Sequence, residues 1–467
     1  MKRSSSLVPP VCWTVALLIW LGPSIIPRCH ARSLDKPYFL KGTSTSSLWT
    51  RGGGGGNSKS TSSESFNFHK NKPIVPSPKE TLDDLEATAS DEYIAHIIDQ
   101  VSLNSTIRGD IILKYKPHRL WLWRRWHGTI LQSSLSKMFG NMLLTAVICL
   151  LLGRVCGLST QENLANPMTW MQDSSCIWIA RLKVFDKLWH YQMQLTTFIL
   201  TFFLTQAYTL WRDMYATGRK IQGRISDVGI LLATHVVRDK HNQLSPEALD
   251  FLHDTARNLR LYHVLVWASV SRQFKVLLTN RGMTALLQRG GFITPKELET
   301  LRQLTDLPVT ARHNAIVEWI VIRSLDATQR GILLDRQELF ALLLDKIGVL
   351  KGTAAGIGDI VDGRMPLAYA HFVQVLVDCF LFAAPLALVS ELGWLSIICV
   401  AFMTLFYEGL LDLAKIFLDP LNNEDYCEGG IDMDLGVFVR EANAGTVKWL
   451  HGAKVLPFDT KPPKRRN

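Results

Sequence analysis

One uncharged stretch, Tyr191 to Trp211, carries side chains suited either to ion passage or to holding helices together. At helical spacing it places an amide and two aromatic rings on one face, flanked by three hydroxyls. These residues are Gln194, Phe198 and Phe202, with Thr197, Thr201 and Thr205 beside them. Such a face is typical of a pore-lining helix, but threonines also let membrane helices approach closely and hydrogen-bond. Periodicity alone leaves both interpretations open.

The composition indicates what must hold this helix in place. The chain has 467 residues, of which 47% are hydrophobic, and its apolar residues are gathered in a few long runs. Runs of this kind cross a bilayer as helices, so the sequence predicts an all-α integral membrane protein. Four spans are expected, at about 135–156, 190–211, 365–390 and 392–418. Apolar residues within 212–364 recur at three- and four-residue spacing, which predicts a helical domain in water.

The charged residues agree with this layout. The net charge is +10, from 51 Lys and Arg against 41 Asp and Glu. Arg124, Arg125, Arg212 and Lys220 flank the first two spans on the side of both termini and of the 212–364 domain, as the positive-inside rule expects. No basic stripe with interleaved aromatic residues occurs away from the spans, so nucleic acid is not an expected partner.

The eight cysteines form no CxxC pair and show no metal-ligand spacing with histidine. They are therefore expected to be small buried residues rather than a disulfide framework or zinc ligands. No Ser–His–Asp, paired-carboxylate or metal constellation stands out in the sequence. We therefore expect a protein that is not an enzyme.

The N-terminal residues look like targeting segments. Residues 1–31 have a basic start, an apolar run and a small-residue end, which favours a secretory signal over a first membrane anchor. Residues 32–110 are expected to be disordered and linker-like, with a partly helical lead-in over 81–100. Their Ser-rich, acid-poor part resembles a plastid transit peptide, with an ordinary disordered linker as the alternative.

Four short segments, in one order along the chain, carry a resemblance to a known family. They are Arg125–Trp126–His127–Gly128–Thr129–Ile130 before the first span, Gly291–Phe292–Ile293–Thr294–Pro295 with Glu297 and Leu301 in the soluble domain, Met365–Pro366–Leu367–Ala368–Tyr369 at the third span, and Tyr407, Gly409, Ala414 and Asp419–Pro420 at the end of the fourth. Together they resemble the bestrophin-family anion channels, of the plant and algal chloroplast type. The resemblance places a channel domain at 111–445 and leaves 446–467 as a basic C-terminal tail.

The resemblance implies a homopentamer whose central pore is lined by five copies of the second helix. Phe198 and Phe202 match the family's aromatic rings in a hydrophobic neck, whereas Gln194 stands where the family often has an aliphatic residue. The implied function is the conduction of small anions, chloride or bicarbonate, across a lipid bilayer. Selectivity would come from aromatic ring edges, from the hydroxyls of the three threonines, and from the easier dehydration of large monovalent anions.

The family pattern also suggests two further sites. Animal members carry a calcium clasp after the fourth span, where this chain has Glu424 and Asp425. Because Tyr426 and Cys427 interrupt the acidic run, a solvated acidic turn is favoured over a calcium site, and no cofactor is expected. A second constriction is expected within 331–340, where Glu338 is the nearest match.

Two other classes of membrane protein remain as alternatives. A carrier would need polar groups that converge from several spans, and only Asp378, His371 and Gln194 are available. A non-conducting scaffold would have the 212–364 domain as its working part. The N-terminal residues favour the plastid thylakoid membrane as the location, with the plasma membrane or another endomembrane as the alternative.

Overall fold

Helices make up the regular structure of the residues that the computed structural model describes, which are 77, 80–102, 110–112, 119, 130–157, 176–239, 241–424 and 433–457. Within these ranges no strand forms, and two isolated bridges, Val236–Leu333 and Arg238–Leu244, pair extended residues. The all-α class expected from the sequence is confirmed. The signal-like segment 1–31, the transit-like residues of 32–76 and the last residues of the tail, 458–467, lie outside the described residues.

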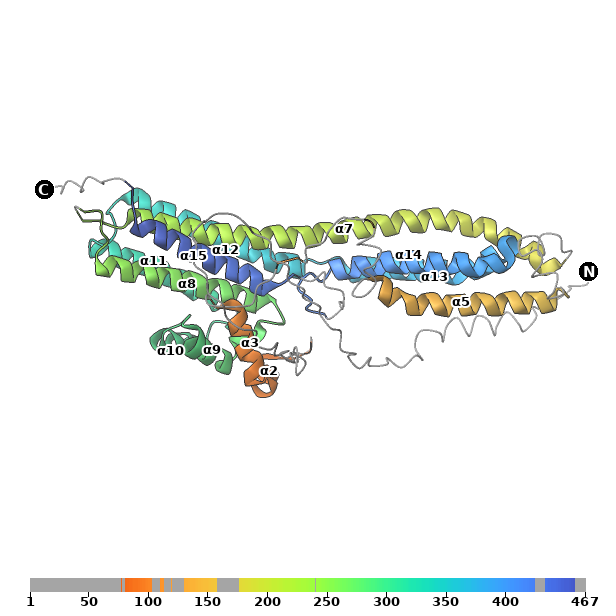
Figure 1. Ribbon diagram of the computed structural model, residues 1–467, viewed down its shortest axis with the longest axis horizontal. Helices are drawn as coiled ribbons and strands as arrows, with labels where there is room; N and C mark the ends of the chain where they lie inside the picture. The colour runs from red at the N-terminus through yellow and green to blue at the C-terminus, as the bar shows by residue number, and fades with distance from the viewer. Residues whose placement is uncertain are drawn as a thin grey trace, which may run out of the picture. The chain divides into compact units, whose positions relative to one another are not determined.

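The longest helix, α7 (Ile177–His235), contacts two groups of helices (Figure 1). Its first half packs on α13 (Leu367–Leu392) and α14 (Ser396–Phe417), and its second half packs on α12 (Gln337–Asp362) and α15 (Leu435–Lys454). The sequence predicted a span ending near 211, but the helix continues without a break for 59 residues. Its buried residues keep a three- and four-residue spacing, which holds one face in contact along both groups.

Two glycines allow α15 to lie close against α7. A Cβ atom added at Gly229 would come within 2.3 Å of the Trp449 ring, and one at Gly218 within 2.9 Å of the Phe438 ring. Side chains at these two positions would therefore force α15 away from α7.

Three further helices have the length or apolar composition of membrane spans. Helix α5 (Ile130–Val155) packs on α14 and α13, and a short 3-10 turn, Gly393–Leu395, joins α13 to α14. Among the described residues, two segments are long and apolar enough to cross a membrane, Ser134–Val155 and Leu367–Phe417. These segments overlap the predicted first, third and fourth spans. The predicted second span, within α7, is less apolar because Gln194 and the threonines lower its hydropathy.

Two large buried clusters hold these helices together. In the first, Trp189, Leu200 and Phe203 of α7 meet Val377 and Phe380 of α13, with residues of α14. In the second, α3 (Asp91–Val101) and the C-terminal α15 join the helices of the 212–364 domain. That domain contains α8 (Pro246–Val270), α9 (Asn280–Ala285), α10 (Pro295–Gln303), α11 (His313–Gln329) and α12, with short turns at Lys275–Leu278, Leu286–Gly290 and Val309–Ala311.

The expectation of disorder over 32–110 is wrong for part of that range. Helices α2 (Leu82–Thr88) and α3 (Asp91–Val101) form there, as the expected helical lead-in over 81–100 suggested. Helix α3 is a core element, because Tyr93, Ile97 and Val101 are buried in the larger cluster. The Tyr93 hydroxyl also donates to the Gln273 carbonyl at 2.9 Å, which ties α3 to the soluble domain.

The predicted start of a basic tail at 446 is also wrong. Helix α15 runs from Leu435 to Lys454, and Trp449, Leu450 and Ala453 are buried in the same large cluster. The apolar residues of this helix recur at helical spacing, with basic residues between them. The helical domain predicted to end at 445 therefore extends past that residue.

Candidate functional site

One face of α7 is uncovered in the single subunit. Gln194, Thr197, Thr201 and Thr205 are exposed, and so are Phe198 at 71% and Phe202 at 50%. On the opposite face Leu200 and Phe203 are each 1% exposed, because they pack against α13. The six residues singled out by helical spacing therefore lie together on a free surface, and the apolar far side contacts a partner helix.

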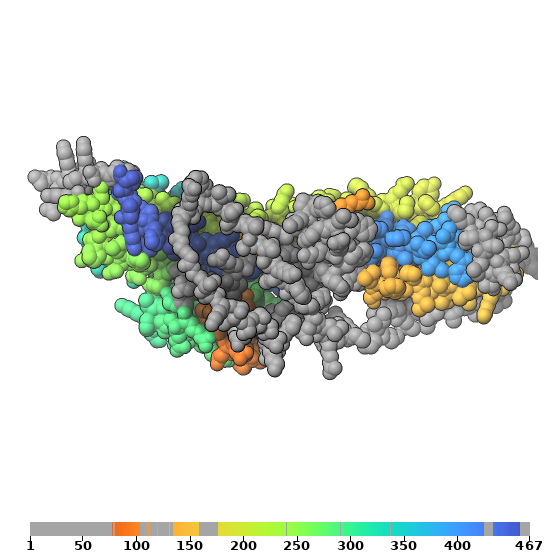
Figure 2. Space-filling view, viewed as in Figure 1, coloured from red at the N-terminus to blue at the C-terminus, as the bar shows by residue number. Residues whose placement is uncertain are grey.

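The uncovered faces of the neighbouring helices have a different chemistry. Between 139 and 151, α5 exposes Phe139, Leu143, Val147, Leu150 and Leu151, apart from a glycine. Helix α14 exposes a stripe of Ile398, Phe402, Phe406 and Leu410. In the space-filling view the surfaces of α5 and of the α13–α14 pair lie side by side (Figure 2). Among the side chains that the structure describes on these three helices, only those of α7 place an amide and several hydroxyls on a free face.

The threonine hydroxyls on this face already donate their protons to the helix backbone. Thr197 bonds the Met193 carbonyl at 2.7 Å, Thr201 the Thr197 carbonyl at 2.8 Å, and Thr205 the Thr201 carbonyl at 2.9 Å. In this rotamer each hydroxyl offers lone pairs outward and no proton. In these rotamers the hydroxyls have no proton to offer an anion, and their role in anion attraction stays a prediction.

Aromatic contacts fix α7 from behind. The Trp189 ring stacks on Phe380 with centroids 4.9 Å apart, and its indole N–H donates to the Phe380 carbonyl at 3.1 Å. Phe203 meets the Tyr369 ring edge to face at 5.7 Å. Bulky rings with defined partners hold a helix rotation more firmly than aliphatic contacts alone. The exposed face of α7 is therefore a positioned surface.

Charged and polar side chains join α5 to α14. Lys137 lies 2.6 Å from Glu408 and 3.5 Å from Asp412, and Asn141 donates to Thr404 at 3.0 Å. Glu408 is nearly buried, so its pairing with Lys137 satisfies a charge that packing would otherwise leave unpaired. The sequence reasoning missed this pair, because two residues so distant along the chain give no local signal.

The Asp378 carboxylate accepts a hydrogen bond from within its own helix, α13. Its carboxylate accepts from Gln374 one turn earlier at 2.7 Å, and both Asp378 and His371 are exposed on α13. Gln194 lies on α7 instead. The polar groups that a carrier would need therefore come from α13 and α7 separately, without a hydrogen bond recorded between them among the described residues.

The acidic turn after α14 is held by its own hydrogen bonds. The Asp419 carboxylate accepts from the amides of Asn423 and Glu424, each at 2.8 Å, and Glu424 pairs with Arg364 at 3.0 Å. Burial raises the pKa of Asp419, more than these amides lower it. Asp425, the other expected calcium ligand, lies outside the described residues. Within the described ranges no group of three or more potential metal ligands occurs.

Glu338, the expected second constriction, lies exposed in the first turn of α12. The loop before it is attached to the end of α7, since the Val237 amide donates to Ile332 at 2.8 Å and the Leu334 amide to His235 at 2.9 Å. Glu338 therefore lies near the far end of the same helix that carries Phe198. Its role as a constriction stays a prediction.

The glycine–phenylalanine–threonine–proline motif has a structural role. Gly291 takes a left-handed backbone with φ of 57°, and Thr294 and Glu297 form a reciprocal capping box at the start of α10. Glu297 also binds Arg257, with the Nη2–Oε1 distance at 2.9 Å. The motif thus fixes a helix start and its attachment to α8. The motif residues 125–129 lie outside the described residues.

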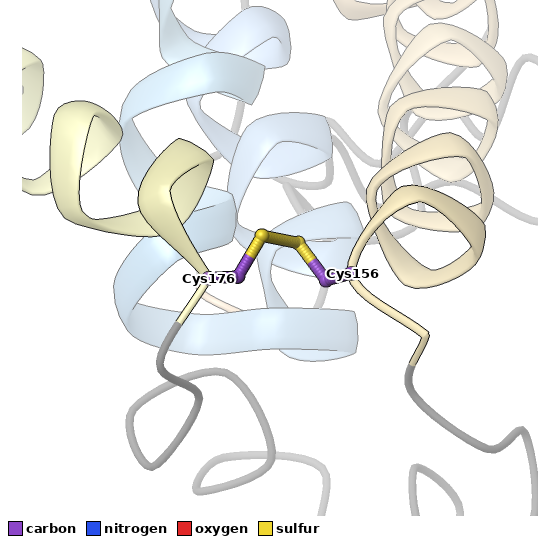
Figure 3. Close-up of a disulfide and its surroundings, with 2 residues drawn as sticks. All are labelled: Cys156 and Cys176. Carbon is purple, nitrogen blue, oxygen red and sulfur yellow. A yellow bond between two sulfur atoms is a disulfide. The ribbon is translucent and has the colours of Figure 1, made fainter.

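A disulfide joins Cys156 to Cys176, which the sequence reasoning did not expect (Figure 3). It links the residue after α5 to the residue before α7, with the Cα atoms 5.7 Å apart. Cys149 is buried, as expected, whereas Cys379 is exposed. The expectation failed because helix ends far apart in the sequence can meet only in the folded chain. Cys156 lies at the end of the predicted first span, whereas Cys176 lies 14 residues before the predicted second span, so the predicted spans did not mark the two cysteines as a pair.

Comparison with known proteins agrees with this architecture. The family model described as "Bestrophin, RFP-TM, chloride channel" matches residues 120–426. Two crystal structures of substituted variants of a bacterial bestrophin homologue from Klebsiella pneumoniae are similar. One is 14% identical, with coverage of 67% of this chain and 99% of that chain at a TM-score of 0.49, and the other is 17% identical, with coverage of 70% and 100% at a TM-score of 0.47. The comparison with curated proteins found no match. Because the family model spans well over half of the sequence, this chain belongs to the bestrophin family.

Proposed function

We propose that this chain is one subunit of a homopentameric channel that conducts chloride, bicarbonate or both through a pore lined by α7. The observation that carries the proposal is the uncovered face of α7, on which Gln194, Phe198 and Phe202 are all exposed. The family supports an anion-channel role, because the description of the matching family names a chloride channel.

The chemistry of this face argues against lipid as its neighbour. A side-chain amide moved from water into hydrocarbon without a hydrogen bond costs roughly 2–7 kcal/mol. Gln194 would carry that cost in every subunit if it faced lipid, whereas the apolar stripes of α5 and α14 would not. Copies of α7 arranged around a water-filled axis would hydrate the amide and keep the rings of Phe198 and Phe202 together. This arrangement fits a wetted mouth followed by a hydrophobic neck.

Two features of the proposed neck favour anions. The edges of phenylalanine rings carry partial positive charge, which weakly attracts anions, and large monovalent anions lose water more easily than small cations. The amide N–H groups of Gln194 can donate directly to a passing anion. The threonine hydroxyls contribute less than the sequence suggested, because their protons are engaged with the backbone.

Exposed apolar residues of the soluble domain support self-association. Helices α11 and α12 leave five large aliphatic side chains exposed, namely Ile322, Leu325, Leu342, Leu344 and Val349. In a domain surrounded by water such residues often mark protein contacts. Contacts between copies of α11 and α12 would hold the subunits around the same axis as α7. We propose the pentamer on this basis and on the family resemblance.

The membrane location follows from the family and the candidate spans. We propose the thylakoid membrane as the specific location, because the composition of residues 1–110 resembles a signal followed by a plastid transit peptide. A fusion of residues 1–110 to a fluorescent protein tests this. Plastid fluorescence is the expected result, and a plasma-membrane signal would overturn it.

Recording from planar bilayers containing the purified full chain tests the conduction proposal. The native channel is expected to pass anion-selective current, and Phe198→Ala is expected to change its anion-to-cation permeability ratio. Phe402→Ala is the matched control, since Phe402 is also an exposed membrane-helix phenylalanine but lies on α14. An assembled protein that passes no anion would favour a scaffold, and saturable flux without current would favour a carrier.

A further inference from the structure

The disulfide between Cys156 and Cys176 is the principal direct link between α5 and α7. Helix α5 packs on α14 and α13, and α7 packs on the same two helices, but α5 and α7 do not pack extensively on each other. The disulfide connects the last turn of one to the first turn of the other (Figure 3). The two sulfurs therefore bridge the end of a bundle in which α5 and α7 pack mainly on α13 and α14.

Noncovalent packing at the start of α7 is thin. The buried cluster around the disulfide has three fully buried members, Cys149, Ile179 and Val389. Four large apolar side chains in the first turns of α7 are exposed instead, at Ile177, Trp178, Val184 and Leu188. The next buried residues along α7 are Asp186, whose carboxyl is hydrogen-bonded with Glu391 of α13, and Trp189, which stacks on Phe380. The bond to Cys156 is thus the covalent restraint on a segment whose other buried residues before Trp189 are Ile179 and Asp186.

We propose that this disulfide is a redox-modification site for a dithiol reductant, and that its state sets the width of the pore mouth. Both cysteines are partly exposed, so a reductant in water can reach the sulfurs. Disulfides form and persist in oxidising compartments, which places the loop between α5 and α7 on an oxidising side of the membrane. The conduction part of the inference rests on the proposed channel function, whereas the chemistry of the bond does not.

The chemical step is a thiol–disulfide exchange. A thiolate of the dithiol attacks one protein sulfur, the Cys156–Cys176 bond breaks, and the other cysteine leaves as a thiolate. The second thiolate of the reductant then attacks the mixed disulfide and releases the first cysteine. Two electrons pass to the protein, two protons from solvent neutralise its thiolates, and the dithiol ends as a disulfide. Reoxidation by a small disulfide reverses each step.

The consequence for the pore follows from the position of the exposed residues. Val184 lies nearly three turns before Gln194, at the edge of the same face of α7, and Leu188 lies outside that face. With the bond intact, the start of α7 is held at α5. Once the disulfide is reduced, this apolar segment is free to bend toward the same segment of the neighbouring subunits and to bury its surface there. This movement narrows the mouth of the proposed pore. Reduction is therefore expected to lower the conductance.

The redox chemistry is tested first, without reference to current. The full chain in sealed vesicles is treated on one side or the other with reduced thioredoxin, a membrane-impermeant protein dithiol, and its thiols are then labelled with a maleimide after denaturation. Two additional thiols, relative to the Cys156→Ser/Cys176→Ser double variant, are expected when the reductant is on the side of the 157–175 loop. Two thiols more than in the double variant already before reduction, or no new thiols from either side, would overturn the proposal.

The second measurement records current from bilayers in both redox states. Reduction on the loop side is expected to lower the current about two-fold or more. Reoxidation should restore it, and the double serine variant should give the low current in either condition. An unchanged current in protein whose bond has been shown to be reduced contradicts the inference. Absence of anion current in both states contradicts the proposed function instead, so the two failures are distinct.

Discussion

The hydroxyl of Tyr407 on α14 lies 2.6 Å from the hydroxyl of Thr197 on α7. Thr197 gives its own proton to the Met193 carbonyl at 2.7 Å, so Tyr407 is the donor in this pair. The bond reaches the free face of α7 from a helix behind it and holds Thr197 in one rotamer beside Phe198. The surface proposed to line the pore is thus tied directly to α14.

Removal of this tie should weaken the membrane bundle slightly. Tyr407→Phe keeps the ring, which also contacts Phe380 with centroids 4.9 Å apart, and removes only the hydroxyl. We expect a loss of about 0.5–1.5 kcal/mol in the free energy of unfolding, the net value of one hydrogen bond. Denaturant unfolding in detergent measures it. Tyr369→Phe is the control, because the Tyr369 ring also contacts α7, at Phe203. If Tyr369→Phe lowered the free energy of unfolding as much as Tyr407→Phe, the hydrogen bond of Tyr407 would not explain the loss.

Thr201→Val tests whether the hydroxyls on α7 matter for anions. Valine has nearly the shape of threonine, and the Thr201 proton is already given to the Thr197 carbonyl at 2.8 Å. We therefore expect the permeability ratio of chloride to sodium to stay within about two-fold of the native value. Reversal potentials in a salt gradient measure this ratio. A large fall in anion preference would show that the hydroxyl turns toward the pore during conduction.

The ion pair between Glu297 and Arg257 should make the soluble domain sensitive to acid. Burial alone would raise the pKa of Glu297, but hydrogen bonds from Arg257 and the Thr294 amide outweigh it and lower that pKa. A carboxyl whose pKa is lower in the folded state adds stability above its unfolded pKa, and this stability is lost as the pH falls through the folded pKa.

Glu297→Gln removes that charge and leaves the shape of the side chain. At pH 7 we expect a loss of about 1.5–3 kcal/mol, the value of hydrogen bonds to a charged group. The difference from the native protein should shrink as the pH falls below about 4.3. Unfolding free energies measured from pH 7 to pH 3 check this. A difference that stays constant with pH would mean that the charge contributes nothing.

His263 should also make the free energy of unfolding fall as the pH falls. It is fully buried in α8, where its Nε2 accepts from the Trp267 indole at 2.8 Å, and burial lowers its pKa to about 3. Between that value and the ordinary pKa near 6.5 the unfolded chain binds the extra proton. Stability should therefore fall by roughly 1.4 kcal/mol for each pH unit below about 6.5.

His263→Gln keeps an acceptor for Trp267 and removes the titrating ring. Its free energy of unfolding should depend less on pH between 6.5 and 4 than that of the native protein. The slope of unfolding free energy against pH is the measurement. His241→Gln, at an exposed histidine, serves as the control and should leave the slope unchanged. Equal slopes for the native and His263→Gln proteins would contradict the prediction.

Local pattern was enough to identify several features of this protein. The apolar runs of α5, α13 and α14 mark their spans, because a membrane core demands long apolar helices whatever their partners. The spacing of Gln194, Phe198 and Phe202 identified the free face of α7, because helical periodicity is a property of one helix. The capping box at Thr294 and Glu297 is likewise readable from adjacent residues.

Contacts between distant residues were decided only by the tertiary structure. The Cys156–Cys176 bond and the Lys137–Glu408 pair each join segments whose proximity depends on how whole helices pack. The threonine rotamers direct the hydroxyl protons to backbone carbonyls, so on the free face of α7 these hydroxyls can only accept hydrogen bonds. The composition of the chain does not reveal this. Helices α3 and α15 became core elements because the 212–364 domain offered them an apolar surface. Periodicity determines which face of a helix is distinctive, and only packing decides what that face meets.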